Sequence, residues 1–370
     1  MLRLDRRGVW VFTAATAAFC LNAATRLDAE EAKVTASAWP EADALFRRDP
    51  RWLGADGAAT VDLGDGRILW LFSDTFIGNK PGATRFDATM VRNSVAIQSH
   101  ADPTTAEFKA FWNAEGERPA SFFADDGQEW FWPGDGELVD GKLIVFMMRV
   151  ERKEGGLGFK VLDWTARLID NPLEPPSKWS PRPVETPTNS FGAKIGFGTV
   201  IRDGDYLYAY APAGPTHAIY VVRWPITQVL AGDLTQPEWW SPADAAWRPH
   251  RDLTGLPEPM IDHGQAEFTV HLDAAKQRYL QVQTAFFPIG PLALRTAPSL
   301  TGPWSSATNF YDPPELSGAP KGFYMYSAKA HLEIAAAGDL AVTYCTNLHS
   351  IYDTVRSPDI YYPRFVRVRF

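Results

Sequence analysis

Cysteine is almost absent from this chain, with 2 residues in 370. Cys20 lies in an N-terminal segment that we expect to be removed, which leaves Cys345 as the single thiol. One thiol excludes an intramolecular disulfide. Cys345 ends the apolar run LAVTYC, where the expected role is that of a small buried hydrophobic residue. No group of cysteines and histidines has the spacing of a zinc site.

Basic charge is also scarce. The chain has 36 Lys and Arg against 44 Asp and Glu, a formal net charge of −8, and no long basic run. Nucleic acid is therefore not an expected partner. Phosphate-binding loops, dinucleotide fingerprints and nucleophile-elbow motifs are missing as well. We expect no cofactor, although Asp, His and Asn side chains in a central channel could hold a structural Ca²⁺.

A long apolar run is missing too. The stretch Gly8–Leu21 is shorter than the roughly 20 residues of a transmembrane helix. Three arginines precede it and small residues follow, which is typical of a signal peptide over residues 1–29. We expect a secreted or periplasmic protein with no integral membrane segment in the mature chain. Phe19, just before Cys20, is too bulky for the usual lipoprotein signal, so lipid anchoring is not expected.

Short apolar strands separated by polar or glycine turns are abundant. The stretch Arg51–Gly78 predicts a β-hairpin, because two strand patterns flank the turn Gly64–Gly66. Asp56 precedes its first strand and Asp74 follows its second. Both carboxyl groups are therefore expected at the open end of this hairpin, on one edge of a sheet.

The same hairpin pattern recurs five times, with its strands at 59–63 and 68–72, 136–139 and 143–146, 198–201 and 206–210, 268–272 and 279–283, and 331–334 and 340–344. A third strand pattern follows each, at 93–99, 162–168, 218–224, 292–296 and 365–370. Helix patterns are confined to Glu41–Phe46 and Thr105–Trp112. We predict an all-β fold, a single-domain five-bladed β-propeller over residues 30–370. A two-sheet sandwich is the alternative, but it does not predict a fivefold repeat.

In a propeller, the starts of the first strands and the ends of the second strands open on one face. Aligning the hairpins places a set of polar and aromatic side chains at this mouth: Asp56, Asp135, Phe197, Glu267 and His331 at the starts, and Asp74, Arg149 and Asn347 at the ends. Asn93 can reach the same mouth from a third strand. Glu137 and Glu333 lie one step further along their strands and are weaker candidates.

Carboxyl groups that meet in a cleft move each other's pKa values apart, so that one stays protonated while another stays ionised. Such a pair hydrolyses glycosides. The candidate catalytic residues are Asp56, Asp74, Asp135 and Glu267. Aromatic side chains nearby are suited to stacking on sugar rings, namely Trp52, Phe76, Trp130, Trp132, Phe197 and Tyr326.

Each candidate also has a structural interpretation. Asp56, Asp74 and Asp135 stand in turn-like contexts where the side chain could serve the backbone. Glu267 could be a solvated strand end and His331 a hydrogen-bonded core histidine. Arg149 could pair with a neighbouring carboxylate.

Several motifs resemble one bacterial family. They are GADG at 54–57 with LWLFSDTFIG at 69–78, WPGDG at 132–136, GFGT at 196–199, and AKAH at 328–331 with YCTN at 344–347. This five-bladed propeller family was long classed as a domain of unknown function. It includes mycobacterial endo-D-arabinanases and is related in shape to arabinanase- and fructosidase-type glycosidases. The resemblance covers about Arg51 to the C-terminus, and its first motif is the most specific.

The resemblance implies hydrolysis of a furanoside or related glycan. By similarity, Asp56 or Asp74 would be the base or nucleophile, Asp135 the modulator of pKa and Glu267 the acid. Independently of the resemblance, positions near the strand ends predict as substrate contacts Trp52, Asn93, Trp132, Arg149, Phe197, His331 and Asn347. We therefore expect an exported, monomeric glycoside hydrolase whose partner is a polysaccharide or oligosaccharide. A non-catalytic glycan-binding propeller and a scaffold for protein partners are the alternatives.

Overall fold

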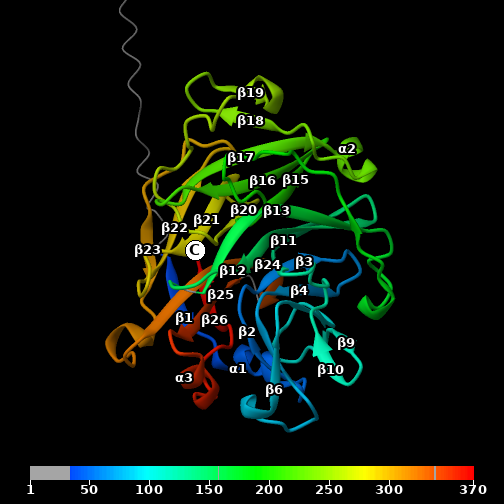
Figure 1. Ribbon diagram of the computed structural model, residues 1–370. Helices are drawn as coiled ribbons and strands as arrows, with labels where there is room; N and C mark the ends of the chain where they lie inside the picture. The colour runs from blue at the N-terminus through cyan, green and yellow to red at the C-terminus, as the bar shows by residue number, and fades with distance from the viewer. Residues whose placement is uncertain (1–33, 157, 337–338) are drawn as a thin grey trace, which may run out of the picture. The chain divides into compact units, whose positions relative to one another are not determined.

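The computed structural model describes residues 34–156, 158–336 and 339–370 (Figure 1). The predicted signal peptide, residues 1–29, lies outside the described residues. Val34–Phe370 forms one compact unit built almost entirely of antiparallel strands. The all-β prediction is thus confirmed. Five sheets of four or five strands make up most of this unit, and each contains one of the five predicted hairpins.

The strands of the first two large sheets follow one another along the chain. The first sheet has the order β3 (Ala59–Asp62), β4 (Ile68–Phe72), β7 (Ser94–Gln98) and β8 (Phe108–Phe111). The second has the order β11 (Glu129–Val139), β12 (Lys142–Arg152), β13 (Phe159–Ile169) and β14 (Arg182–Pro183).

The next two large sheets repeat this meander. The third sheet contains β15 (Val200–Asp203), β16 (Tyr206–Ala213), β17 (Ala218–Pro225), β18 (Glu238–Ser241) and β19 (Ala246–Pro249). The fourth contains β20 (Thr269–Asp273), β21 (Arg278–Thr284), β22 (Leu292–Ala297) and β23 (Thr308–Tyr311). All five predicted hairpins and all five predicted third strands are present, because alternating burial and glycine turns specify them locally.

The fifth large sheet joins the two ends of the described chain. Its order is β24 (Phe323–Ala336), β25 (Asp339–Leu348), β26 (Arg364–Arg369) and β1 (Thr35–Ala38). Thr35 pairs with Arg369 and Ala38 with Val366. An N-terminal strand therefore completes the C-terminal sheet, which ties residues more than 300 positions apart.

The first strands of the five sheets are linked to one another in a closed cycle. Three links have the same form, in which a side-chain oxygen accepts a backbone N–H from the next sheet: Asp135 Oδ2 from Val200 (2.8 Å), Thr199 Oγ1 from Val270 (2.8 Å) and Thr269 Oγ1 from Ala330 (2.9 Å). Thr60 Oγ1 lies 2.6 Å from His331 Nδ1 and links the fifth sheet to the first. Gly136 packs on Val61, where an added Cβ would come within 3.3 Å of a methyl group, and this contact closes the cycle.

Smaller elements complete the unit. One small sheet contains β2 (Trp52–Ala55), β5 (Thr75–Gly78) and β6 (Ala88–Val91). Another contains β9 (Asn113–Glu115) and β10 (Arg118–Ala120). The helices are short: α1 (Pro40–Asp43), α2 (Ile226–Ala231) and α3 (Ile351–Arg356), with 3₁₀ turns at Ala44–Arg47, Arg85–Asp87, Pro176–Lys178, His250–Asp252 and Pro314–Ser317. Among the residues that the structure describes, no helix is long and apolar enough to cross a membrane.

One helix prediction is confirmed and the other is wrong. Glu41–Phe46 falls within α1 and the 3₁₀ turn that continues it. Thr105–Trp112 instead contains the strand β8, which pairs with β7. Phe108 and Ala110 are buried while Lys109 between them is exposed, so the segment follows a two-residue period rather than a helical one.

Candidate active site

Asp56 and Asp74 lie side by side where the opening hairpin passes from one sheet to another. The hairpin continues beyond β3 and β4 as the pair β2 and β5, so the two acids do not stand at its open end. They stand at the break between these two ladders, where the Ser73 N–H donates to the Asp56 carbonyl oxygen at 2.9 Å. The backbone turns sharply here, with positive φ at Gly57 (86°) and Ala58 (49°). This break directs both carboxyl groups to one place.

The Asp56 carboxyl group lies among hydroxyl groups and other acids, and it forms no ion pair with any of the described residues. The hydroxyl groups of Tyr326 and Tyr361 both donate to its Oδ2 atom, the second at 3.2 Å. Its buried Oδ1 atom has no hydrogen-bond partner among the described residues. Burial raises the pKa of Asp56 to about 8, helped by the nearby charges of Asp74 and Glu267 and opposed by the two tyrosine hydroxyl groups. Asp56 is therefore mostly protonated at neutral pH.

Asp74 has partners that favour its ionised form. Trp132 Nε1 donates to Asp74 Oδ1 at 2.9 Å, and Arg92 Nη1 lies 3.4 Å from Asp74 Oδ2. Burial nevertheless raises the pKa of Asp74, while Arg92 and Trp132 oppose that rise. Tyr361 connects the two acids, because its hydroxyl group also donates to the Asp74 carbonyl oxygen at 3.1 Å.

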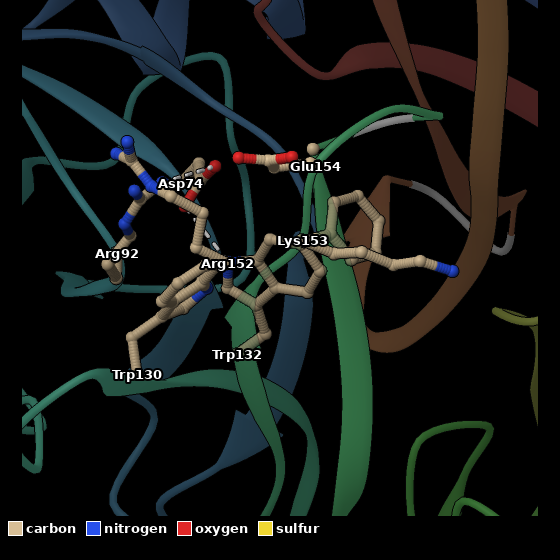
Figure 2. Close-up of a pocket in the computed structure, with 9 residues that line it drawn as sticks. Asp74, Arg92, Trp130, Trp132, Arg152, Lys153 and Glu154 are labelled. Carbon is tan, nitrogen blue, oxygen red and sulfur yellow. Dashed lines mark hydrogen bonds and ion pairs between the residues drawn. The ribbon is translucent and has the colours of Figure 1, made fainter.

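A cavity of about 440 Å³ opens beside Asp74. Aromatic and charged side chains line it, and Figure 2 shows most of them: Arg92, Trp130, Trp132, Arg152, Lys153, Glu154 and Phe159. The Arg92 guanidinium lies 4.3 Å from the ring centroid of Trp130. In Figure 2 the Glu154 carboxylate extends toward Asp74, whereas the Lys153 amine points away from it. Indole rings beside polar groups form the kind of surface that binds sugar rings.

Glu267 meets Asp56 from the fourth sheet. Its Oε1 atom accepts a hydrogen bond from Ser327 Oγ at 2.8 Å and lies 3.5 Å from Lys329 Nζ. The Ser327 hydroxyl group also lies 2.8 Å from the carbonyl oxygen of Gly57, the residue after Asp56. Ser327 thus joins the first, fourth and fifth sheets at the point where Asp56, Asp74 and Glu267 converge.

Asp135 is placed differently from these three acids. It lies within β11 at a bulge, and its two oxygens accept the backbone N–H groups of Gly136 (2.9 Å) and Val200 (2.8 Å). Burial raises the pKa of Asp135 to about 7, against these two hydrogen bonds and the charge of Lys329. Its acidic neighbours are Glu137 and Glu333. Asp135 therefore joins two adjacent first strands, as Thr199 and Thr269 do in other sheets.

His331 and Asn93, two of the predicted substrate contacts, lie inside the protein. His331 is 1% exposed, and its ring nitrogens lie 2.6 Å from Thr60 Oγ1 and 2.7 Å from Thr343 Oγ1. Burial lowers the pKa of His331, so the ring is neutral. Asn93 is fully buried and bonds to backbone groups of Phe123 and Phe131. These geometries match the structural interpretation of both side chains.

The remaining predicted contacts divide in the same way. Trp52 is 1% exposed and packs between Phe46 and Phe72, so neither face of its indole is free. Phe197 is buried and belongs to an apolar cluster with Trp130, Met148 and Val150. The other two bond to near neighbours: Arg149 pairs with Glu129 at 2.6 Å, and the Asn347 side chain accepts from Leu348 N–H and the Thr354 hydroxyl group. Trp132 alone among the predicted aromatic contacts both lines the cavity and bonds to a candidate acid.

Sequence reasoning missed several residues that hold the three acids. Arg92 precedes Asn93, and Lys329 stands inside the motif that was noted for His331, but nothing in either pattern indicates a partner. Tyr361 lies more than 280 positions from Asp56 and Asp74, and Ser327 lies 60 positions from Glu267, so no local signal could identify them. Over the described ranges, no group of three or more His, Cys, Asp or Glu side chains is arranged to hold a metal ion.

Comparison with known proteins places the chain in one family. The model of the family described as "Domain of unknown function (DUF5005)" matches residues 41–369, and the chain belongs to this family. No curated protein sequence matches it.

Among solved structures, one from Bacteroides ovatus is similar, with a TM-score of 0.71, 18% identity and 90% of each chain covered. Its description assigns it provisionally to the hydrolases. The catalytic domain of a Coprinopsis cinerea GH62 α-L-arabinofuranosidase matches with a TM-score of 0.49, 10% identity and coverage of 86% of this chain and 91% of that one. A GH43_1 enzyme from Xanthomonas citri matches with a TM-score of 0.45, 14% identity and coverage of 89% and 92%. The first likeness shows a shared fold.

Proposed function

We propose that this member of the DUF5005 family is an exported glycoside hydrolase that cuts a furanoside-type or related polysaccharide with paired carboxyl groups. The observation that carries the proposal is the convergence of Asp56, Asp74 and Glu267. Asp56 has no cationic partner among the described residues and a pKa of about 8, whereas Asp74 and Glu267 each lie beside a cation. An acid that keeps its proton beside carboxyl groups with cationic partners is the arrangement that glycoside hydrolysis requires.

In the proposed reaction, the bond between the anomeric carbon and the leaving oxygen breaks. Asp56 gives its proton to that oxygen, and water supplies the hydroxyl group of the new reducing end. The proton of this water passes to an ionised carboxylate, for which Asp74 and Glu267 are the two candidates. This assignment differs from the one that the resemblance implies, in which Glu267 is the acid. It follows the electrostatics, because Glu267 lies 3.5 Å from a buried ammonium group.

The proposal includes the fold and the location of the protein. The cycle of hydrogen bonds through the first strands supports a five-bladed β-propeller, with one large sheet per blade. The cavity at Trp130 and Trp132 would bind sugar rings beside Asp74. Export follows from the predicted signal peptide at residues 1–29, and N-terminal sequencing of the protein recovered from the culture medium or periplasm tests it. We also propose a monomer.

The test is incubation of the purified protein with arabinan, galactan, fructan and mycobacterial-type arabinogalactan. We expect release of oligosaccharides or sugars from at least one glycan, and a roughly 10²–10⁴-fold lower rate for Asp56→Asn. Asp56→Asn keeps the shape of a carboxylic acid that is already neutral, so its unfolding temperature serves as the control. Equal rates for the wild type and this variant would exclude Asp56 as the acid.

A second candidate function is a glycan-binding module without catalysis. It is favoured by the pairing of Asp74 with Arg92 and of Glu267 with Lys329, since carboxylates paired in this way can simply hold a binding surface in shape. Calorimetric binding to the same glycans without release of any product would support this function.

A further inference from the structure

Lys329 is a buried cation at the centre of the proposed site. It lies on β24, its side chain is 1% exposed, and its Nζ atom forms no hydrogen bond within the described residues. Buried lysine side chains without a partner are costly, so a fold keeps one only where its charge is compensated. The nearest compensation is Glu267 Oε1 at 3.5 Å.

The position of Lys329 in the fold is also unusual. In three sheets, the residue at this position accepts the backbone N–H of the next sheet, as Asp135, Thr199 and Thr269 do. Val200 and Val270, which directly follow Thr199 and Thr269, each donate their backbone N–H to the preceding sheet. Ala330, which directly follows Lys329, does the same. Lys329 therefore occupies the next position of the series. An ammonium group cannot accept a hydrogen bond, so this position does not serve the fold as the other three do.

The charge of Lys329 reaches the titratable groups on every strand around it. Glu267 faces it from the start of the fourth sheet, and Ser327 holds the same Glu267 oxygen at 2.8 Å. The other groups within its electrostatic reach are Asp135 of β11, His331 of β24 and Cys345 of β25. His331 is neutral, and Asp135 has both oxygens occupied by backbone N–H groups. Glu267 is thus the carboxylate on which the Lys329 charge acts most directly.

We propose that Lys329 is a positioning residue whose buried side chain, together with the Ser327 hydroxyl group, holds the Glu267 carboxyl group in place beside Asp56. This inference rests on the proposed function for its catalytic consequence, but the pairing itself can be tested without any substrate. Lys329 touches no reacting atom in this scheme. It supplies a positive charge to one of the carboxyl groups that surround Asp56.

The first test is a thermal unfolding cycle on the full-length chain at pH 7, with Lys329→Met, Glu267→Gln and the double variant. Glu267→Gln leaves a buried ammonium group uncompensated, and we expect it to lower Tm by roughly 5–10 °C. The double variant removes both charges and is expected to recover at least half of that loss. Additive losses in the double variant would overturn the pairing. Lys321→Met, which removes an exposed charge just before β24, is the matched control and should leave Tm unchanged.

The second test is the pH dependence of kcat/KM on whichever glycan the wild type cuts. A positive charge within about 4–6 Å of a carboxyl group typically lowers its pKa by roughly 1–3 units, and Lys329→Met removes that charge. We expect the acidic limb of the Lys329→Met profile to move to higher pH by about that amount, so that activity recovers as pH rises. A uniform loss at every pH, with unchanged limbs, would mean a merely structural role and would overturn the proposal.

The two tests separate the failure of this inference from the failure of the proposed function. If no glycan is cut, the hydrolase proposal falls, and the unfolding cycle still decides whether Lys329 and Glu267 are coupled. If a glycan is cut but neither the cycle nor the acidic limb shows coupling, the role of Lys329 falls and the hydrolase stands. Should Lys329→Met alone fail to fold, the double variant decides, because adding Glu267→Gln removes the carboxyl group that is left without its partner: recovered folding supports the pairing, and a double variant that also fails to fold overturns it.

Discussion

Two groups of buried acids in this protein look alike in the sequence and differ in the structure. Asp56 and Asp74 stand at the break between the β3–β4 and β2–β5 ladders and lie near Glu267, where hydroxyl groups, an indole, Arg92 and a cavity surround them. Asp135 and Glu137 lie in the interior with Glu333, and both oxygens of Asp135 accept backbone N–H groups. Burial raises a pKa in each group. A raised pKa alone therefore does not mark a catalytic acid, and the partners of the carboxyl group distinguish the two roles.

The largest expected difference separates Asp135→Ala from Asp56→Asn. Asp135→Ala leaves the N–H groups of Gly136 and Val200 without their acceptors and breaks one link of the closed cycle that joins the first strands of the five sheets. We expect it to lower the free energy of unfolding by about 2–4 kcal/mol, whereas Asp56→Asn should change it by less than about 1 kcal/mol. Urea unfolding at pH 7 measures both. A smaller loss for Asp135→Ala than for Asp56→Asn would remove the distinction between the two groups.

The second prediction concerns stability and pH. The pKa values of Asp56 and Glu137 are raised to about 8 and that of Asp135 to about 7, so these three groups hold more protons in the folded protein than in the unfolded chain up to about pH 8. His271 and His331, whose pKa values burial lowers, act in the opposite direction below about pH 6.5. From about pH 6.5 to 8, stability therefore falls as pH rises, and it levels off above this window. Unfolding midpoints in urea from about pH 6.5 to 9 should show this decline, and Glu137→Gln should make it shallower. A midpoint that rises from about pH 6.5 to 8 would contradict the burial of these acids.

The smallest expected effect concerns Trp132, which lines the cavity beside Asp74. Trp132→Phe keeps an aromatic ring but removes the N–H that donates to Asp74. If Asp74 works as an ionised carboxylate, we expect a roughly 5- to 10-fold loss in kcat/KM, about the net strength of one ordinary hydrogen bond. Trp247→Phe, on β19 of the third sheet, is the control and should leave kcat/KM unchanged. Equal losses of kcat/KM for the two substitutions would show that the hydrogen bond from Trp132 to Asp74 has no specific part in catalysis.

Much of the fold could be predicted because its signals are local. The five hairpins follow from alternating burial and glycine turns, and the third strands follow from the same pattern. Thr105–Trp112 was mispredicted because its acidic and aromatic residues resemble a helix, whereas pairing with β7 decides its conformation. The site was predicted less well. Asp56, Asp74 and Glu267 lie near one another in the structure, as the alignment of the hairpins predicts, whereas Asp135, His331 and Trp52 share their sequence context and lie in the interior.

The sequence by itself determined which segments are strands, where the chain turns and which acids stand near strand ends, because those properties depend on neighbours a few positions apart. The tertiary structure decided which acids meet. Tyr326 is 270 positions from Asp56 and Ser327 is 60 from Glu267, and these contacts exist only once the sheets are arranged around their first strands. Burial and partner charges act through space, so the division between acids that could catalyse and acids that hold the fold appears only there.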